Sequence, residues 1–317
     1  SFSEYKNFIE QNSEYPRINR IRFLAEEKIY LRNNSPTSII NWFDKYPPLG
    51  GMGKIKLAEA YLEKGQTEKV QELIKEGWET ATISKNDLGY YRAKFKKFID
   101  SEDHIRGADY LAWEKKYWDL KRMLKYLPKD QRALYNARQI LMSNSYGVDN
   151  AISKVPEYLK KDPGLEFDRL RWRNRRGRLE GSLEILYRNS IKTEQQMVRP
   201  DKWWEQRESV VRSLIYKKRY KTAYKISSEH ALSAGPSFAE AEWLSGWIAL
   251  TFLNSPEYAI NHFQNFYNNV GYPISLARGA YWLGASYEKL NEKQLSNDFY
   301  SQAAEFPMTY YGQLAFN

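Results

Sequence analysis

The stretch Arg278-Gly279-Ala280-Tyr281-Trp282-Leu283-Gly284 decides the fold class, because it combines small residues with large aromatic ones at helical spacing. The small residues let two helices approach closely, and the aromatic side chains fill the space beside them. A related phrase, Trp243-Leu244-Ser245-Gly246, lies about 39 residues earlier. Each phrase precedes a turn and a second predicted helix, over 256–267 and 292–305. Ala223 and Ala259 mark equivalent close-packing positions about 36 residues apart. Repeats of this length indicate stacked helical hairpins.

The same pattern occurs earlier in the chain. Val70, Leu73, Ile74, Gly77 and Trp78 fall on one face of a helix that Thr67 opens. The helix before it ends at Gly65, where a left-handed residue is expected. No run of alternating apolar and polar residues predicts a strand.

These patterns predict an all-α protein, a right-handed superhelix of helical hairpins. It is a tetratricopeptide-like α-solenoid that closes toward a ring. Residues 1–200 are expected to be an irregular α-superhelical region, because Pro47-Pro48, Asp162-Pro163-Gly164 and Arg199-Pro200 break the period. Residues 201–317 are expected to form the regular hairpins.

Composition limits the kinds of site that the chain can hold. The 317 residues include no Cys and only three His, His104, His230 and His262, so neither a metal site nor a cofactor is predicted. No stretch has the apolar length of a membrane span, and residues 1–30 lack the apolar core of a signal peptide. Because the chain starts at Ser1, we expect a processed product. The net charge of +10 favours an anionic partner.

Arginines are densest between residues 169 and 178, and Arg169, Arg173 and Arg176 form one helical stripe. Two interpretations stand beside each other, a solvated or interhelical face and a contact surface for anionic glycan or a partner. Trp203 and Trp204 allow the same two interpretations, core packing or stacking on a sugar.

Phrases in a fixed order extend these patterns along nearly the whole chain. They are Trp42-Phe43, Tyr46-Pro47-Pro48, Asp103-His104, Val155-Pro156, Asp168-Arg169-Leu170-Arg171-Trp172, Trp203-Trp204, Glu240-Ala241-Glu242-Trp243-Leu244-Ser245-Gly246-Trp247, Pro273-Ile274-Ser275 and Tyr281-Trp282-Leu283-Gly284. The last is Thr309-Tyr310-Tyr311-Gly312-Gln313. Taken together, they resemble the superhelical region of the soluble lytic murein transglycosylases.

The function that this resemblance implies depends on a catalytic domain that these phrases do not include. In that family a lysozyme-like domain carries a catalytic Glu that cleaves the MurNAc–GlcNAc bond to a 1,6-anhydro product. Thr309, Tyr310, Tyr311, Gly312 and Gln313 resemble the junction with that domain, so no catalytic residue is expected in this chain. The resemblance implies a periplasmic scaffold, with its export signal removed, that positions peptidoglycan strands for its own catalytic domain or binds cell-wall proteins.

Other functions remain open from the sequence alone. Glu240 and Glu242 are two residues apart on a helix and point to different sides, as do Glu26 and Glu27, so neither pair is expected to cleave a glycoside. The main alternative is a freestanding tetratricopeptide-like scaffold that binds proteins. A nucleic-acid-binding solenoid is less favoured, because only Trp172 is interleaved with the arginines.

Overall fold

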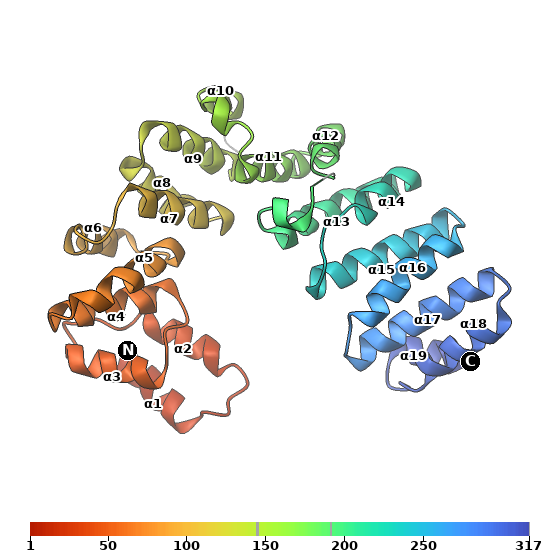
Figure 1. Cartoon of the computed structure of the whole chain (residues 1–317), viewed down its shortest axis with the longest axis horizontal. Helices are drawn as coiled ribbons and strands as arrows, with labels where there is room; N and C mark the ends of the chain where they lie inside the picture. The colour runs from red at the N-terminus through yellow and green to blue at the C-terminus, as the bar shows by residue number, and fades with distance from the viewer. Residues whose placement is uncertain (144–145, 191, 317) are drawn as a thin grey trace. The chain divides into compact units, whose positions relative to one another are not determined.

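The computed structural model describes residues 1–143, 146–190 and 192–316 (Figure 1). Within these ranges the chain is 74% helical and contains no strand. Consecutive helices pack on each other in the order of the chain, which is the arrangement of an α-solenoid. The all-α solenoid predicted from the sequence is therefore confirmed.

The chain divides into two compact units, Ser1–Leu165 and Glu166–Asn317. The division falls inside helix α11 (Pro163–Arg175), whereas the breaks in the sequence pattern suggested residue 200. The boundary at residue 200 describes where the hairpins become regular and stays a prediction. The closure of the superhelix toward a ring, and its hand, also stay predictions, because they depend on how the units are placed.

Unit 1 is built from short helices of unequal length joined by varied turns. They are α1 (Phe2–Gln11), α2 (Ile18–Glu26), α3 (Pro36–Lys45), α4 (Gly51–Glu63), α5 (Val70–Thr80), α6 (Lys85–Lys94), α7 (Ser101–Trp113), α8 (Tyr117–Met123), α9 (Lys129–Leu141) and α10 (Val148–Ser153). Short 3-10 turns lie at Thr67–Lys69, Leu124–Tyr126 and Glu157–Leu159.

Unit 2 contains longer helices that lie side by side as antiparallel hairpins (Figure 1). They are α12 (Leu179–Asn189), α13 (Pro200–Tyr216), α14 (Tyr220–Ser228), α15 (Gly235–Phe252), α16 (Pro256–Asn268), α17 (Pro273–Lys289), α18 (Lys293–Ala304) and the short α19 (Tyr310–Phe316). A 3-10 turn at Glu194–Gln196 precedes α13.

The α4–α5 hairpin shows how the sequence sets a helix and its end. Gly65 has a φ of 75°, the left-handed conformation expected where α4 stops. Val70, Ile74 and Trp78 are at most 1% exposed, so the predicted apolar face of α5 is buried. The helix begins at Val70 instead of Thr67, because Thr67–Lys69 forms a separate 3-10 turn.

Glycines at the hairpin crossings of unit 2 confirm the close approach predicted from the sequence. A Cβ added at Gly246 would lie 2.8 Å from the Phe263 ring, and one at Gly284 would lie 2.8 Å from the Tyr300 ring. Real Cβ contacts are not this short, so only glycine lets each aromatic ring lie against the facing helix. Ala223 and Ala259 are fully buried, as the close-packing prediction requires.

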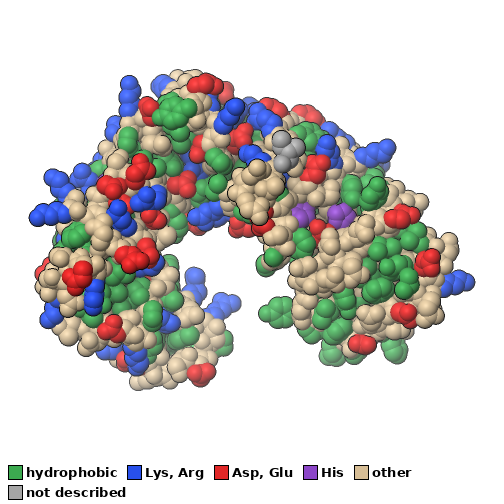
Figure 2. All heavy atoms as spheres, viewed as in Figure 1, with side chains coloured by type: hydrophobic (Ala, Val, Ile, Leu, Met, Phe, Trp, Pro, Cys, Tyr) green, Lys and Arg blue, Asp and Glu red, His purple; other side chains and the backbone are tan. Residues whose placement is uncertain are grey.

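The surface of the chain is mixed, with basic and acidic side chains dispersed over both units (Figure 2). Over the last helices, α17 to α19, hydrophobic and neutral atoms dominate the face shown. No helix within the described ranges is long and apolar enough to cross a membrane.

Candidate binding site

The predicted arginine stripe lies on α11, but its three members have different surroundings. The Arg173 guanidinium donates to the carbonyl oxygen of Gly181, and its Nη1 lies 3.1 Å from Glu184 Oε2, so it ties α11 to α12. Arg169 is half-buried, and burial together with the charge of Arg173 lowers its pKa. Arg176 is exposed, and its guanidinium lies 5.2 Å from the centre of the Trp172 ring. The stripe is therefore interhelical at Arg173 and open to solvent at Arg176.

Trp203 and Trp204 lie in the core of unit 2, with 1% and 3% of their surface exposed. Trp203 packs edge to face on Phe167, and Trp204 packs in the same way on the His230 ring. α13 is covered on two sides, which is why two successive tryptophans are both buried. Of the two interpretations that the sequence left open, core packing agrees with this burial, which leaves neither ring exposed for stacking on a sugar.

Asp168 and Arg171, next to the stripe, form a buried ion pair. Arg171 Nη2 lies 3.0 Å from Asp168 Oδ1, with exposures of 5% and 0% for the two residues. The sequence prediction that Asp168 is a structural ion-pair partner is confirmed. This part of the arginine-rich segment belongs to the interior and contributes no charge to the surface.

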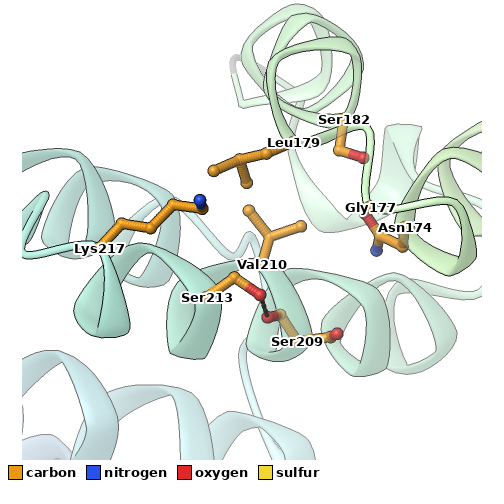
Figure 3. A pocket seen from close by; sticks show the side chains of 8 residues that line it. All are labelled: Asn174, Gly177, Leu179, Ser182, Ser209, Val210, Ser213 and Lys217. Atoms are coloured by element: carbon orange, nitrogen blue, oxygen red, sulfur yellow. Dashed lines mark hydrogen bonds between the residues drawn. The ribbon is translucent and has the colours of Figure 1, made fainter.

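A pocket opens beside the end of the stripe, where the C-terminal end of α11, the start of α12 and α13 meet (Figure 3). Its volume is about 280 Å³. Polar groups come from Asn174 at one end, Lys217 at the other, and Ser182, Ser209 and Ser213 between them. All belong to unit 2, so the pocket is formed within one compact body.

Leu179 and Val210 form the apolar part of the pocket. Val210 is 3% exposed and lies at its centre, and Leu179 faces it from α12 (Figure 3). Gly177 adopts a φ of 64° between α11 and α12, and this left-handed turn brings the start of α12 back over α13. The pocket therefore combines a cation, hydroxyls, an amide and an aliphatic floor, the mixture that binds a small polar ligand.

A second polar cluster, which sequence reasoning missed, lies between α14, α15 and α16. Glu242 accepts hydrogen bonds from His230 Nε2 at 3.1 Å, His262 Nδ1 at 2.6 Å and Asn265 Nδ2 at 3.3 Å. Two histidine side chains with an acidic side chain between them are visible over this region in Figure 2, although His230 and Glu242 are each only 5% exposed. The partners are 12, 20 and 23 residues from Glu242, so no spacing within one helix could reveal them.

The hydrogen bonds fix the proton positions in this cluster. The Leu232 N–H donates to His230 Nδ1 at 3.0 Å, so the ring proton is on Nε2 and points to Glu242. His262 Nε2 faces the Tyr224 hydroxyl at 3.0 Å. Burial acts to raise the pKa of Glu242, but the bonds from His230 and His262 outweigh it and lower the pKa to about 2. The carboxylate is ionised and saturated with donors, which suits a structural joint and not a proton-transferring acid.

The other carboxylates considered for catalysis are also separated. Glu240 lies 3.4 Å from Arg278, away from the partners of Glu242. Glu26 is buried and accepts the N–H of Gly50 at 3.0 Å, whereas Glu27 is exposed. The prediction that both pairs diverge is confirmed.

The residues that resemble a junction form a capped short helix. Thr309 Oγ1 accepts the Gly312 N–H at 3.0 Å, at the start of α19. The Tyr311 ring lies 5.3 Å from the Tyr281 ring, which packs α19 against α17. Gln313 Nε2 donates to the carbonyl of Pro307 at 3.2 Å, and Tyr310 is 68% exposed. These contacts hold the segment against unit 2; its role as a junction stays a prediction.

No protein-family model matches this chain, and no curated protein or solved structure is significantly similar to it. The class that the fold itself defines is an α-solenoid whose second unit consists of helical hairpins. Within the described residues no group of three His, Cys, Asp or Glu side chains is placed to hold a metal ion.

Proposed function

We propose that this chain is the superhelical, non-catalytic region of a periplasmic peptidoglycan lytic transglycosylase. Its role is to position murein strands, or partner proteins, for a lysozyme-like catalytic domain. The observation that carries the proposal is the place of the ordered sequence phrases in the solenoid. Three of them, those that contain His104, Glu242 and Trp282, supply residues that join one helix to another.

The phrase Asp103-His104 illustrates this in unit 1. His104 Nδ1 accepts the Trp78 Nε1–H at 3.1 Å and thereby joins α7 to α5. Asp103 completes the capping box that starts α7, and its carboxylate accepts the Asp100 N–H at 2.8 Å. A polar phrase at a buried joint supports the interpretation of the ordered phrases as a fold signature.

The phrases of unit 2 lie at equivalent joints. Glu242 on α15 bonds to His230, in the loop between α14 and α15, and to His262 on α16. The Arg278 guanidinium lies 3.5 Å from the centre of the Trp243 ring, which couples α17 to α15. Such joints hold neighbouring helices of unit 2 in fixed positions, and a rigid row of helices suits the positioning of an extended polymer.

Sedimentation with purified sacculi tests the proposal. We expect the chain to pellet with sacculi, and the Arg169→Gln/Arg173→Gln/Arg176→Gln variant to bind about tenfold less tightly, because each lost charge weakens attraction to an anionic polymer. Lys96→Gln/Lys97→Gln/Lys121→Gln removes three exposed charges from unit 1 and serves as the control, with less than a twofold change expected. Circular dichroism confirms that each variant is folded.

The same preparation tests the absence of catalysis. Incubation of the chain with sacculi should release no 1,6-anhydromuropeptides, because Glu240 and Glu242 bond to different partners and do not face a common site. Anhydro products from the purified chain would contradict the non-catalytic role. Failure to pellet with sacculi, together with capture of a specific protein, would favour the freestanding tetratricopeptide-like scaffold.

A further inference from the structure

We propose that the pocket between α11, α12 and α13 binds the terminal carboxylate of a short peptide that ends in a small aliphatic residue. The ligand is defined by its chemistry, so the proposal does not depend on the murein assignment. Three features of the pocket correspond to three parts of a peptide end: the carboxylate, the last N–H and the last side chain.

Lys217 supplies the charge for the carboxylate. It is exposed, forms no ion pair within the described residues, and extends its ammonium across the pocket toward Leu179 (Figure 3). Neighbouring cations are engaged elsewhere: Arg219 pairs with Glu180, and the Arg178 guanidinium lies 4.7 Å from the centre of the Trp172 ring. Lys217 is therefore placed to offer its ammonium to a bound carboxylate.

Asn174 supplies an acceptor at the opposite end of the pocket. Its Nδ2 donates to the backbone carbonyl of Gln206 at 3.2 Å and to Gln206 Oε1 at the same distance. That contact fixes the orientation of the amide and leaves Oδ1 to accept the N–H of a ligand. The Ser213 hydroxyl donates to the Ser209 carbonyl at 3.0 Å, so Ser213 too can offer a lone pair to a donor. A cation at one end, the Asn174 acceptor at the other and the Ser213 hydroxyl between them match the polarity of a peptide end.

The size and floor of the pocket limit the side chain that the terminal residue can carry. The pocket volume of about 280 Å³ is slightly below the roughly 300 Å³ at which pockets begin to hold drug-sized ligands. Leu179 and Val210 provide an aliphatic surface for one small side chain. A phosphate suits the pocket less well, because it needs several donors and would face the Asn174 oxygen.

Methyl NMR locates and measures the binding. Chain 1–317 with labelled Leu and Val methyls is titrated with N-acetyl-alanyl-alanine, with its C-terminal amide, and with inorganic phosphate. We expect the acid to shift the Leu179 and Val210 methyls and to bind about fivefold more tightly than the amide, the upper range for an exposed ion pair. In Lys217→Gln the acid and the amide should bind equally.

Matched variants separate this effect from a general loss of charge or fold. Lys221→Gln removes an exposed charge on α14, outside the pocket, and should keep the fivefold preference for the acid. Ser209→Trp places a large ring at an exposed, pocket-lining position and should abolish the shifts while the remaining methyl spectrum stays native. The proposal is overturned if the acid fails to shift these methyls, if Lys217→Gln keeps the preference, or if phosphate binds more tightly than the acid.

Discussion

Lys56 in unit 1 and Glu242 in unit 2 are both buried ionisable side chains, but their surroundings differ. In unit 1, Lys56 is 1% exposed, and its ammonium has no hydrogen-bond partner in the described residues. It lies 3.7 Å from the centre of the Tyr30 ring, and burial lowers its pKa to about 8 although Glu59 acts to raise it. In unit 2, Glu242 is similarly buried but accepts three N–H groups, and its pKa falls to about 2.

Burial alone therefore favours the neutral form of Lys56, whereas a complete set of donors keeps Glu242 charged. The same cost of desolvation acts on both groups, and hydrogen bonding decides the outcome. Lys56 should consequently destabilise unit 1, whereas unit 2 should depend on the charge of Glu242 for stability.

The largest expected effect follows from removal of the Glu242 carboxylate. Glu242→Ala leaves the donors of His230, His262 and Asn265 without their acceptor, and we expect a loss of about 4 kcal/mol in the free energy of unfolding. Glu240→Ala, two residues away, removes only the 3.4 Å contact with Arg278 and should cost less than about 1 kcal/mol. Urea unfolding followed by circular dichroism measures both.

Acid should reproduce part of this loss in the unmodified chain. The pKa of Glu242 is about 2 in the folded chain and near 4.5 when unfolded, so its stabilisation is complete above pH 4.5. It should be lost as the pH falls from 4.5 toward 2, by up to about 3 kcal/mol. A Glu242→Gln chain whose stability declines equally over this range would contradict the assignment.

These two buried charges also show what the sequence could and could not predict. The face of α5 and the crossings at Gly246 and Gly284 were predictable, because each depends on spacing within one helix or on a repeated phrase. The Glu242 cluster was not, because its partners come from the loop before α15 and from α16, and only the packing brings them together.

The candidate pocket was beyond prediction for the same reason. Asn174 and Lys217 are separated by the whole of α12, and the left-handed turn at Gly177 brings their helices together. For Trp203 and Trp204 the sequence left two interpretations open. Only the packing of other helices around α13 shows that both rings are buried in the core.

In unit 1, the backbones of α4 and α5 are in contact where the two helices cross. The next largest expected loss of stability comes from a change at this crossing. A Cβ at Gly51 would lie 2.5 Å from the Ala81 nitrogen and 2.6 Å from the Gly77 oxygen, so Gly51→Ala must separate α4 from α5. We expect a loss of about 3 kcal/mol, measured by urea unfolding.

Gly89→Ala is the matched control for this change. Gly89 lies within α6, and an added Cβ would have no neighbour within 4 Å. The substitution should stabilise the chain by about 0.5–1 kcal/mol, because alanine favours the helix. Equal behaviour of the two alanine variants would show that the crossing at Gly51 is not tight.

Lys56→Met should stabilise unit 1, in contrast to any change at Glu242. Methionine fills a similar volume between the tyrosine rings without a buried charge, and we expect a gain of about 2 kcal/mol at pH 7. Lys54→Met, on the same helix, removes a more exposed residue that pairs with Glu76 at 2.5 Å and should change stability by less than about 1 kcal/mol.

The pH dependence checks the cause of that gain. Between pH 8 and 10.5 the folded chain holds fewer protons on Lys56 than the unfolded chain, so this residue makes stability rise with pH. The difference in unfolding free energy between Lys56→Met and the unmodified chain should therefore shrink from pH 8 to pH 10. A constant difference would mean that Lys56 is not desolvated.

The smallest expected effect distinguishes the two regular crossings of unit 2. Gly246 faces the fully buried Phe263 ring, whereas Gly284 faces Tyr300, whose ring is half-buried and whose hydroxyl donates to Glu288 at 2.8 Å. A buried ring cannot move aside, but a half-buried ring can rotate toward solvent. Gly246→Ala should therefore cost about 2 kcal/mol and Gly284→Ala about 1 kcal/mol in urea unfolding.

Hydrogen exchange measured along the chain shows which helices lose stability in each variant. We expect Gly246→Ala to increase exchange across α15 and α16, and Gly284→Ala to do so in α17 and α18 alone. If Gly284→Ala proved the more damaging, the Tyr300 ring would have to be fixed by its bond to Glu288, and Gly284→Ala/Tyr300→Phe should then recover most of the loss. Unit 2 would in that case resemble unit 1, where a rigid contact and not a movable side chain limits the approach of two helices.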